Sequence, residues 1–128
     1  MIEEGLMTYL LAQSGITAYV SDRISPAMAD QDVETPYIIV TKVSGAREHS
    51  HDGSSHLAHP RFQLSIFAET YKECKDIAAA VQSALQGYAG AMGSETVQNV
   101  IYRNEVDDYE DETGLYGVKV DYDIWHVE

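Results

Sequence analysis

The chain has 128 residues, the length of one domain, and its 21 acidic and 8 basic side chains give a formal net charge of −13 at pH 7. Because nucleic-acid binding requires lysine and arginine to displace counterions, this charge argues against a protein that grips DNA or an anionic membrane, although it suits a wall that guides DNA without holding it. No apolar run approaches the ~20 residues that cross a bilayer, and the N-terminus lacks the features of a signal peptide. A single cysteine excludes an intramolecular disulfide. Together these features are typical of a cytoplasmic protein.

The first element in chain order is predicted to be a short amphipathic helix over residues 2–13, because its apolar residues recur at helical spacing and two glutamates lie near its start. Ser14-Gly15 is the predicted end, since glycine readily takes the left-handed conformation in which many helices end. We expect a short extended piece at residues 19–24 and then an irregular loop up to Pro36, which suits the first position of a strand.

Two strands are predicted next. Tyr37–Ser44 is rich in β-branched residues, and Arg61–Ala68 alternates apolar and polar side chains as a half-buried strand does. We expect them to form an antiparallel hairpin with a tip at residues 45–60 that is longer than ordinary hairpin loops. Because its glycine and serines leave little to bury, the sequence predicts that this tip is flexible in the isolated subunit.

The clearest predicted helix covers residues 70–88. Thr70, followed three residues later by Glu73, matches a capping box. Cys74 lies on the apolar stripe of this helix, so we interpret it as a small buried thiol and not as a nucleophile. The stripe is formed by Cys74, Ile77, Ala78, Val81, Ala84, Leu85 and Tyr88.

The last third of the chain is predicted to contain a long strand at residues 96–106, an acidic turn at 107–114 and a final strand at 116–127. The predicted order is therefore α-β-β-α-β-β. This order indicates an α+β fold in which a mostly antiparallel sheet of about four strands has two helices packed on one face. We expect a single domain over residues 1–128.

Catalytic motifs are absent from the sequence. It has no nucleophile elbow, no phosphate-binding glycine loop and no paired cysteines, so we expect neither an enzyme nor a bound cofactor. The acidic cluster at residues 105–112 lacks the spaced oxygen ligands and the mid-loop glycine of a calcium-binding EF-hand. It is interpreted as a solvated turn.

Four of the five histidines lie in the predicted tip. They are weak candidates for holding Zn²⁺ or Ni²⁺, because a structural metal site usually needs rigid elements and outer-shell partners that a serine-rich tip does not offer. Protonated near pH 6, they would offset part of the negative charge. The four residues are His49, His51, His56 and His59.

Four segments, in this order, resemble the small tail-completion proteins of long-tailed bacteriophages, also described as tail-terminator or head–tail joining proteins. The likeness lies in the succession of segments over most of the chain and not in any one chemical motif. The segments are VSDRISP, TPYIIVTKVSG, RFQLSIFAETYKECKDIAAAVQSAL and YEDETGLYGVKVDYDIWHVE.

The resemblance implies a structural virion or prophage protein that assembles as a hexameric ring at the head-proximal end of the tail tube. Such a ring ends tube polymerisation and offers a surface to the head connector or stopper protein. Its partners would be further copies of itself, the tube protein and the connector, with DNA passing through unbound. The resemblance implies a place in the virion tail after assembly in the host cytoplasm.

Two sets of residues are candidate interface residues under this interpretation: the tip histidines His49, His51, His56 and His59, and the acidic residues Asp107, Asp108, Glu110, Asp111 and Glu112. Fixing a flexible tip costs about 1–2 kcal/mol of backbone entropy per residue, which partner contacts must offset. Two alternatives remain open from the sequence: a small metal-binding protein that uses the segment from His49 to His59, and an unrelated acidic adaptor.

Overall fold

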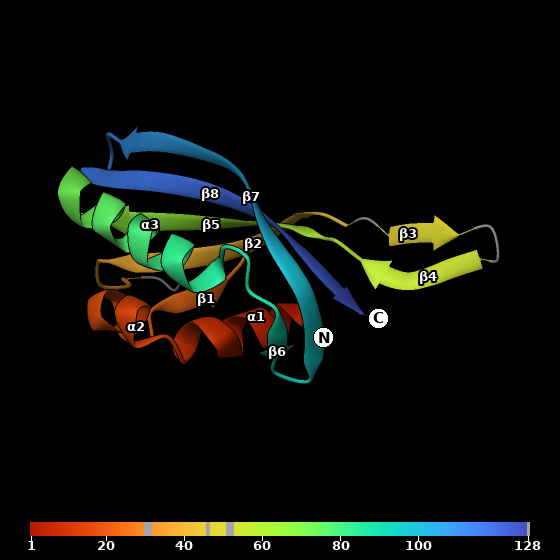
Figure 1. Ribbon diagram of the computed structural model, residues 1–128. Helices are drawn as coiled ribbons and strands as arrows, with labels where there is room; N and C mark the ends of the chain where they lie inside the picture. Colours follow the sequence, from red (N-terminus) through yellow and green to blue (C-terminus); the bar gives the residue numbers. More distant parts are fainter. Residues whose placement is uncertain (30–31, 46, 51–52, 128) are drawn as a thin grey trace.

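The structure, a computed structural model, describes residues 1–29, 32–45, 47–50 and 53–127, and the side chains of these residues apart from 47–50 and 53–56. This part of the chain forms three helices and eight strands (Figure 1). In chain order they are α1 (Ile2–Leu11), α2 (Ser14–Val20), β1 (Ile24–Pro26), β2 (Tyr37–Ser44), β3 (Arg47–Ser50), β4 (Gly53–Ala58), β5 (Arg61–Ala68), α3 (Tyr71–Leu85), β6 (Gly90–Met92), β7 (Glu95–Glu110) and β8 (Leu115–Val127). No helix among the described residues is long and apolar enough to cross a membrane.

The eight strands belong to one mixed sheet. Strand β1 runs parallel to β2, and β2, β5, β8 and β7 follow one another with antiparallel pairing. Strand β6 pairs only with the start of β7. The hairpin β3–β4, which we call the arm, joins the sheet where Leu57 and Ala58 pair with the end of β8, and it projects beyond the rest of the fold (Figure 1).

The predicted fold class, a sheet of about four strands with two helices, is wrong in its strand number and its helix number, and the sheet is mixed, although β1–β2 is the one parallel pairing among the described strands. Four of the eight strands, β1, β3, β4 and β6, have only three to six residues each, and their pairing with distant segments makes them strands. Short segments of this kind carry too little periodicity to be recognised from sequence. The parallel pairing of β1 with β2 makes the sheet mixed.

The predicted end of the first helix at Ser14-Gly15 is also wrong. Helix α1 ends at Leu11, and Ser14 begins a second helix, α2, which the sequence did not predict and which overlaps the predicted extended piece only at Tyr19 and Val20. Tertiary packing explains the difference, because Ile16 and Val20 place one side of α2 in the core. Burial of that side stabilises a helix that would be too short to form alone.

Helix α3 follows the prediction closely. The Thr70 hydroxyl accepts a hydrogen bond from the Glu73 amide, so the predicted N-cap is confirmed. The helix packs against β5 and β8, and burial of Ile77, Val81 and Leu85 contributes about 1.5–3 kcal/mol each. Its buried residues are Cys74, Ile77, Ala78, Val81 and Leu85.

The long strand in the last third extends further than predicted. Strand β7 continues to Glu110, so residues 107–110 of the predicted acidic turn pair with β8 and only residues 111–114 turn. Gly114, with φ of 71°, takes the left-handed conformation that closes the turn. The pairing of β2 with β5 and the strand assignments of Tyr37–Ser44 and Arg61–Ala68 are confirmed.

Candidate functional site

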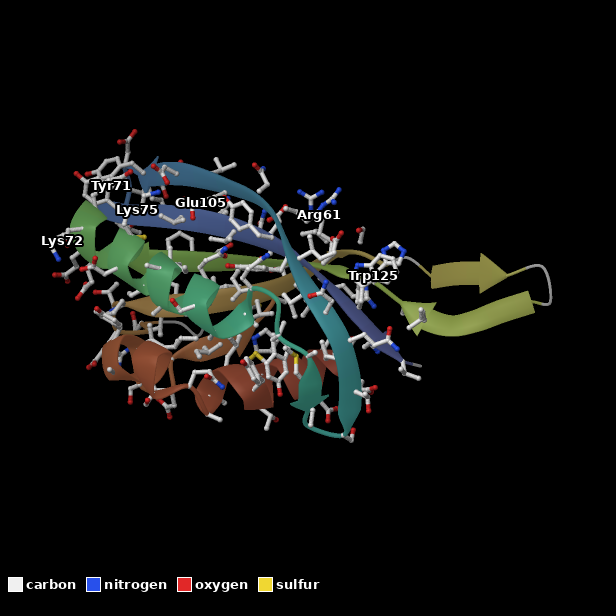
Figure 2. The ribbon with its side chains drawn as sticks, in the orientation of Figure 1. Arg61, Tyr71, Lys72, Lys75, Glu105 and Trp125 are labelled. Carbon is white, nitrogen blue, oxygen red and sulfur yellow. The ribbon has the colours of Figure 1, made fainter. Side chains whose placement is uncertain are left out.

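Charged and polar side chains bind the end of β7 to α3. We call residues 105–110 of this strand the acidic edge. The Lys75 ammonium lies 2.8 Å from Asp107 Oδ1 and 3.0 Å from Glu105 Oε2, and the Tyr71 hydroxyl donates to Asp107 Oδ2 at 2.7 Å. Figure 2 shows Tyr71, Lys75 and Glu105 gathered where the first half of α3 faces β7. These contacts hold the acidic edge beside the helix.

The same contacts fix the charges of the groups involved. Hydrogen bonds from Lys75 and from Tyr71 hold the pKa of Asp107 below its usual 3.8. Hydrogen bonds to Asp107 and Glu105 raise the pKa of Lys75, and the bond to Asp107 raises the pKa of the Tyr71 hydroxyl. Each shift favours the charge state that the group already has at neutral pH, so none of these three groups is prepared for proton transfer there.

A groove of about 330 Å³ lies between α3 and β7. Its alanines and its tyrosine ring offer apolar surface, and its lysine, glutamine and glutamate offer polar groups at the rim. The groove therefore suits side chains of another polypeptide better than a reacting substrate. It is lined by Lys75, Ala78, Ala79, Gln82, Tyr102 and Glu105.

The predicted acidic interface residues are divided between a strand and a turn, and all five are exposed. Asp107, Asp108 and Glu110 lie in β7, and Asp111 and Glu112 lie in the turn that follows. Asp108 Oδ1 accepts from the Tyr109 amide and Glu110 Oε1 accepts from the Thr113 hydroxyl, each at 2.8 Å. Their role as interface residues stays a prediction.

The base of the arm is held to β8 by aromatic and charged contacts. The ring of His59 stacks on Trp125, with centroids 4.1 Å apart and planes 13° from parallel. Arg61 Nη2 lies 2.7 Å from Asp121 Oδ2, and Gln63 Nε2 donates to Asp121 Oδ1 at 3.0 Å. Figure 2 shows Arg61 and Trp125 close to the point where the arm leaves the sheet. These contacts tie residues 59–63, the segment that directly follows the arm, to β8.

Of the four predicted histidines, His59 is the one whose side chain the structure describes. His49 lies in β3 and His56 in β4, each described in its backbone only, and His51 lies outside the described residues. Among the residues whose side chains are described, no group of three metal-ligating side chains is found. A metal site on the arm therefore stays an untested prediction.

Cys74 is fully buried, as predicted, and its thiol donates to the Ile66 carbonyl at 3.2 Å. Burial raises the pKa of the thiol to about 11. The thiolate that a nucleophile needs is therefore scarce at neutral pH.

The sequence did not identify the residues that contact the acidic edge and the base of the arm. These are Tyr71 and Lys75 at the acidic edge and Trp125 beside the arm. A partial signal existed, since Tyr71 and Lys75 are four residues apart and so share one side of α3. Nothing in the sequence indicated that Asp107, more than thirty residues further on, lies opposite them.

No curated protein matches the chain. Among solved structures, a chain described as "Virion of native gene transfer agent (GTA) particle" matches with a TM-score of 0.78 and 16% identity, covering 94% of this chain and 90% of the other, so the two share a fold. The family described as "Tail completion protein gp17" matches residues 4–127. The chain therefore belongs to the tail completion protein gp17 family and has a structural role in a phage tail.

Proposed function

We propose that the protein closes the head-proximal end of the tail tube as a hexameric ring, ends tube polymerisation and provides the surface to which the head connector or stopper protein attaches. The observation that supports this most is the match to the tail completion family over residues 4–127. The ring acts through its shape and performs no bond-making step. In this proposal the ring assembles in the cytoplasm of the host cell and becomes part of the virion tail of a phage or prophage.

Two surfaces support assembly into a ring. Each subunit of a ring needs two different contact faces, because one patch meets a different patch on the next copy. The acidic edge lies toward one end of the molecule and the arm projects from the opposite end (Figure 1). In our proposal the candidate interface residues are the tip histidines and the acidic residues 107, 108 and 110–112.

The net charge of −13 supports a further part of the proposal. A channel wall with excess carboxylates repels the phosphate backbone, so DNA can pass during ejection without being held. This makes DNA a passing molecule and not a ligand.

Removal of the gene from a phage tests the proposal. Electron micrographs of lysates without the protein should show full heads separated from tails and tails of irregular length, and expression in trans should restore joined particles. As a control, a synonymous recoding of the gene should leave particles normal. Joined heads and tails of normal length in the absence of the protein would refute the proposed function.

A further inference from the structure

The outer edge of β7 is open along most of the strand. Strand β6 pairs with β7 only from Glu95 to Val97, and β8 occupies the other edge from Val97 to Glu110. Where the end of α3 passes, the Tyr102 amide donates to Gln86 Oε1 and the Val100 carbonyl accepts from Gly87. Beyond Tyr102, no strand in the described part of the chain pairs with this outer edge.

The backbone at the acidic edge offers donors to an added strand. The Tyr109 amide bonds to the neighbouring Asp108 side chain, so it points away from β8. Pairing with β8 is regular from Asn104 to Glu110, and amides in such a ladder alternate between the two edges. The amides of Glu105 and Asp107 therefore point outward with that of Tyr109. An extended segment that lies beside these residues gains main-chain hydrogen bonds.

Apolar surface surrounds this open edge. Four of the ten large hydrophobic side chains that are exposed in the described structure gather here: Tyr71, Tyr102, Val106 and Tyr109, between 40% and 50% exposed. The groove over Ala78 and Ala79 continues this surface on the α3 side. A strand beside β7 would place alternate side chains into the groove and over Val106, which provides sequence preference beyond the backbone bonds.

Charge decides which strand can dock. Residues 105–112 carry six carboxylates and no basic side chain, so two such edges repel each other and a symmetric β7–β7 contact is disfavoured. The arm segment 45–60 has one arginine, two acidic residues and four histidines, and is close to neutral. The arm is therefore more compatible with the acidic edge than a second acidic edge would be. Its place at the opposite end of the molecule allows head-to-tail contacts (Figure 1).

We infer that the outer edge of β7 from Glu105 to Glu110, with the groove between it and α3, is the docking site for the arm of a second copy of this chain. The arm adds a strand to the sheet of its neighbour. The inference deepens the proposed function, on which it rests, because it names the contact that links one subunit to the next.

Cross-linking tests this contact directly. Cys74 is buried, so an engineered cysteine is the one readily accessible thiol of the native chain. A Val106→Cys copy mixed with a Ser50→Cys copy and a short bis-maleimide should give a cross-linked dimer. The yield should exceed that of the control mixture, Leu11→Cys with Ser50→Cys, by about tenfold, because docking raises the local concentration of the two thiols. Each variant alone should give only background. Equal yields in the two mixtures would overturn the inference.

A second pair of variants isolates the main-chain bond. Tyr109→Pro and Tyr109→Ala both remove the ring, but only the proline removes the outward-pointing donor, a change that edge strands tolerate. In sedimentation experiments the proline variant should self-associate about tenfold more weakly than the alanine variant. If the two variants have equal melting temperatures and self-associate equally strongly, strand addition at this edge is contradicted.

Failure of the inference and failure of the proposed function are distinguishable. If the control and docking mixtures behave alike but phage without the gene still lacks joined tails, the function stands and the docking site is wrong. A wild-type protein that stays monomeric at every concentration in sedimentation also overturns the docking site, while the phage experiment decides the function separately.

Discussion

The close approach of α1 to β6 gives a prediction with a built-in control. Gly5 is buried in α1, and a Cβ at this position would lie 3.0 Å from the Met92 carbonyl carbon and still closer to its oxygen. Gly93, with φ of 60°, faces Gly5 from the turn after β6. Gly15, in α2, has no atom within 4 Å of an added Cβ. Gly5→Ala and Gly15→Ala therefore differ in packing, although both replace a helical glycine.

Two effects set the difference in the free energy of unfolding between Gly5→Ala and Gly15→Ala: helix propensity and packing. Alanine in place of glycine in a helix contributes roughly 0.5–1 kcal/mol to stability at both positions. At Gly5 the added methyl must displace backbone, and overpacking of this kind costs about 1–3 kcal/mol. We expect Gly15→Ala to stabilise the protein, Gly5→Ala to be neutral or destabilising, and the free energies of unfolding of the two variants to differ by about 1–3 kcal/mol.

Chemical denaturation monitored by circular dichroism measures this difference, with the slope of the transition compared so that the two variants are known to unfold from similar states. Thermal unfolding should give a gap of roughly 4 °C for each kcal/mol in a chain of this length. If both alanine variants were more stable than wild type by the same amount, the packing of α1 against β6 described above would be refuted.

Three further predictions concern single side chains. Tyr122→Phe removes the hydrogen bond that the hydroxyl of the buried Tyr122 donates to Gln82 Oε1 at 2.5 Å. The free energy of unfolding, measured by urea titration, should fall by about 0.5–1.5 kcal/mol. An unchanged midpoint of the urea transition would contradict this prediction. Lys75 lowers the pKa of Asp107, so the contribution of the Asp107 carboxylate to stability is present above pH 3.8 and is lost as the pH falls below that value. The melting temperatures of wild type and Asp107→Asn should therefore differ at pH 6 and converge in acid. A difference that stays constant with pH would argue against the ion pair. The Cys74 thiol, with its pKa of about 11, should resist a thiol reagent at pH 8 in the native protein and react fully in denaturant; fast labelling of the native protein would show that it is exposed.

Strong local patterns explain which elements were predicted correctly. Tyr37–Ser44 and Arg61–Ala68 have the exact bounds expected, since each is a continuous β-branched or alternating segment, and α3 combines a cap with a clear apolar stripe. These signals depend on neighbours in sequence. They are therefore visible before any tertiary structure is known.

The elements that were missed depend on distant partners. Ile24–Pro26 becomes a strand because β2 lies beside it, and Gly90–Met92 because the start of β7 does. Helix α2 exists because the core accepts Ile16 and Val20. Local propensity is weak in each of these segments, and tertiary packing decides their conformation.

The candidate site was predicted in part. The acidic residues of 107–112 were identified from composition, but their place on an open strand edge required the register of β7 with β8. The groove beside them joins Lys75 and Ala79 of α3 to Tyr102 of β7, which are more than twenty residues apart in sequence. No spacing rule links such residues, so the groove, and with it the proposed docking surface, could not be inferred before the fold was known.

The symmetry of the assembled protein tests the central claim most directly. Averaged electron micrographs of the purified, assembled chain should show closed rings in which every subunit makes the same head-to-tail contact, with the arm of one copy against β7 of the next. A closed two-fold dimer joined through identical patches, or particles without rotational symmetry, would contradict the claim.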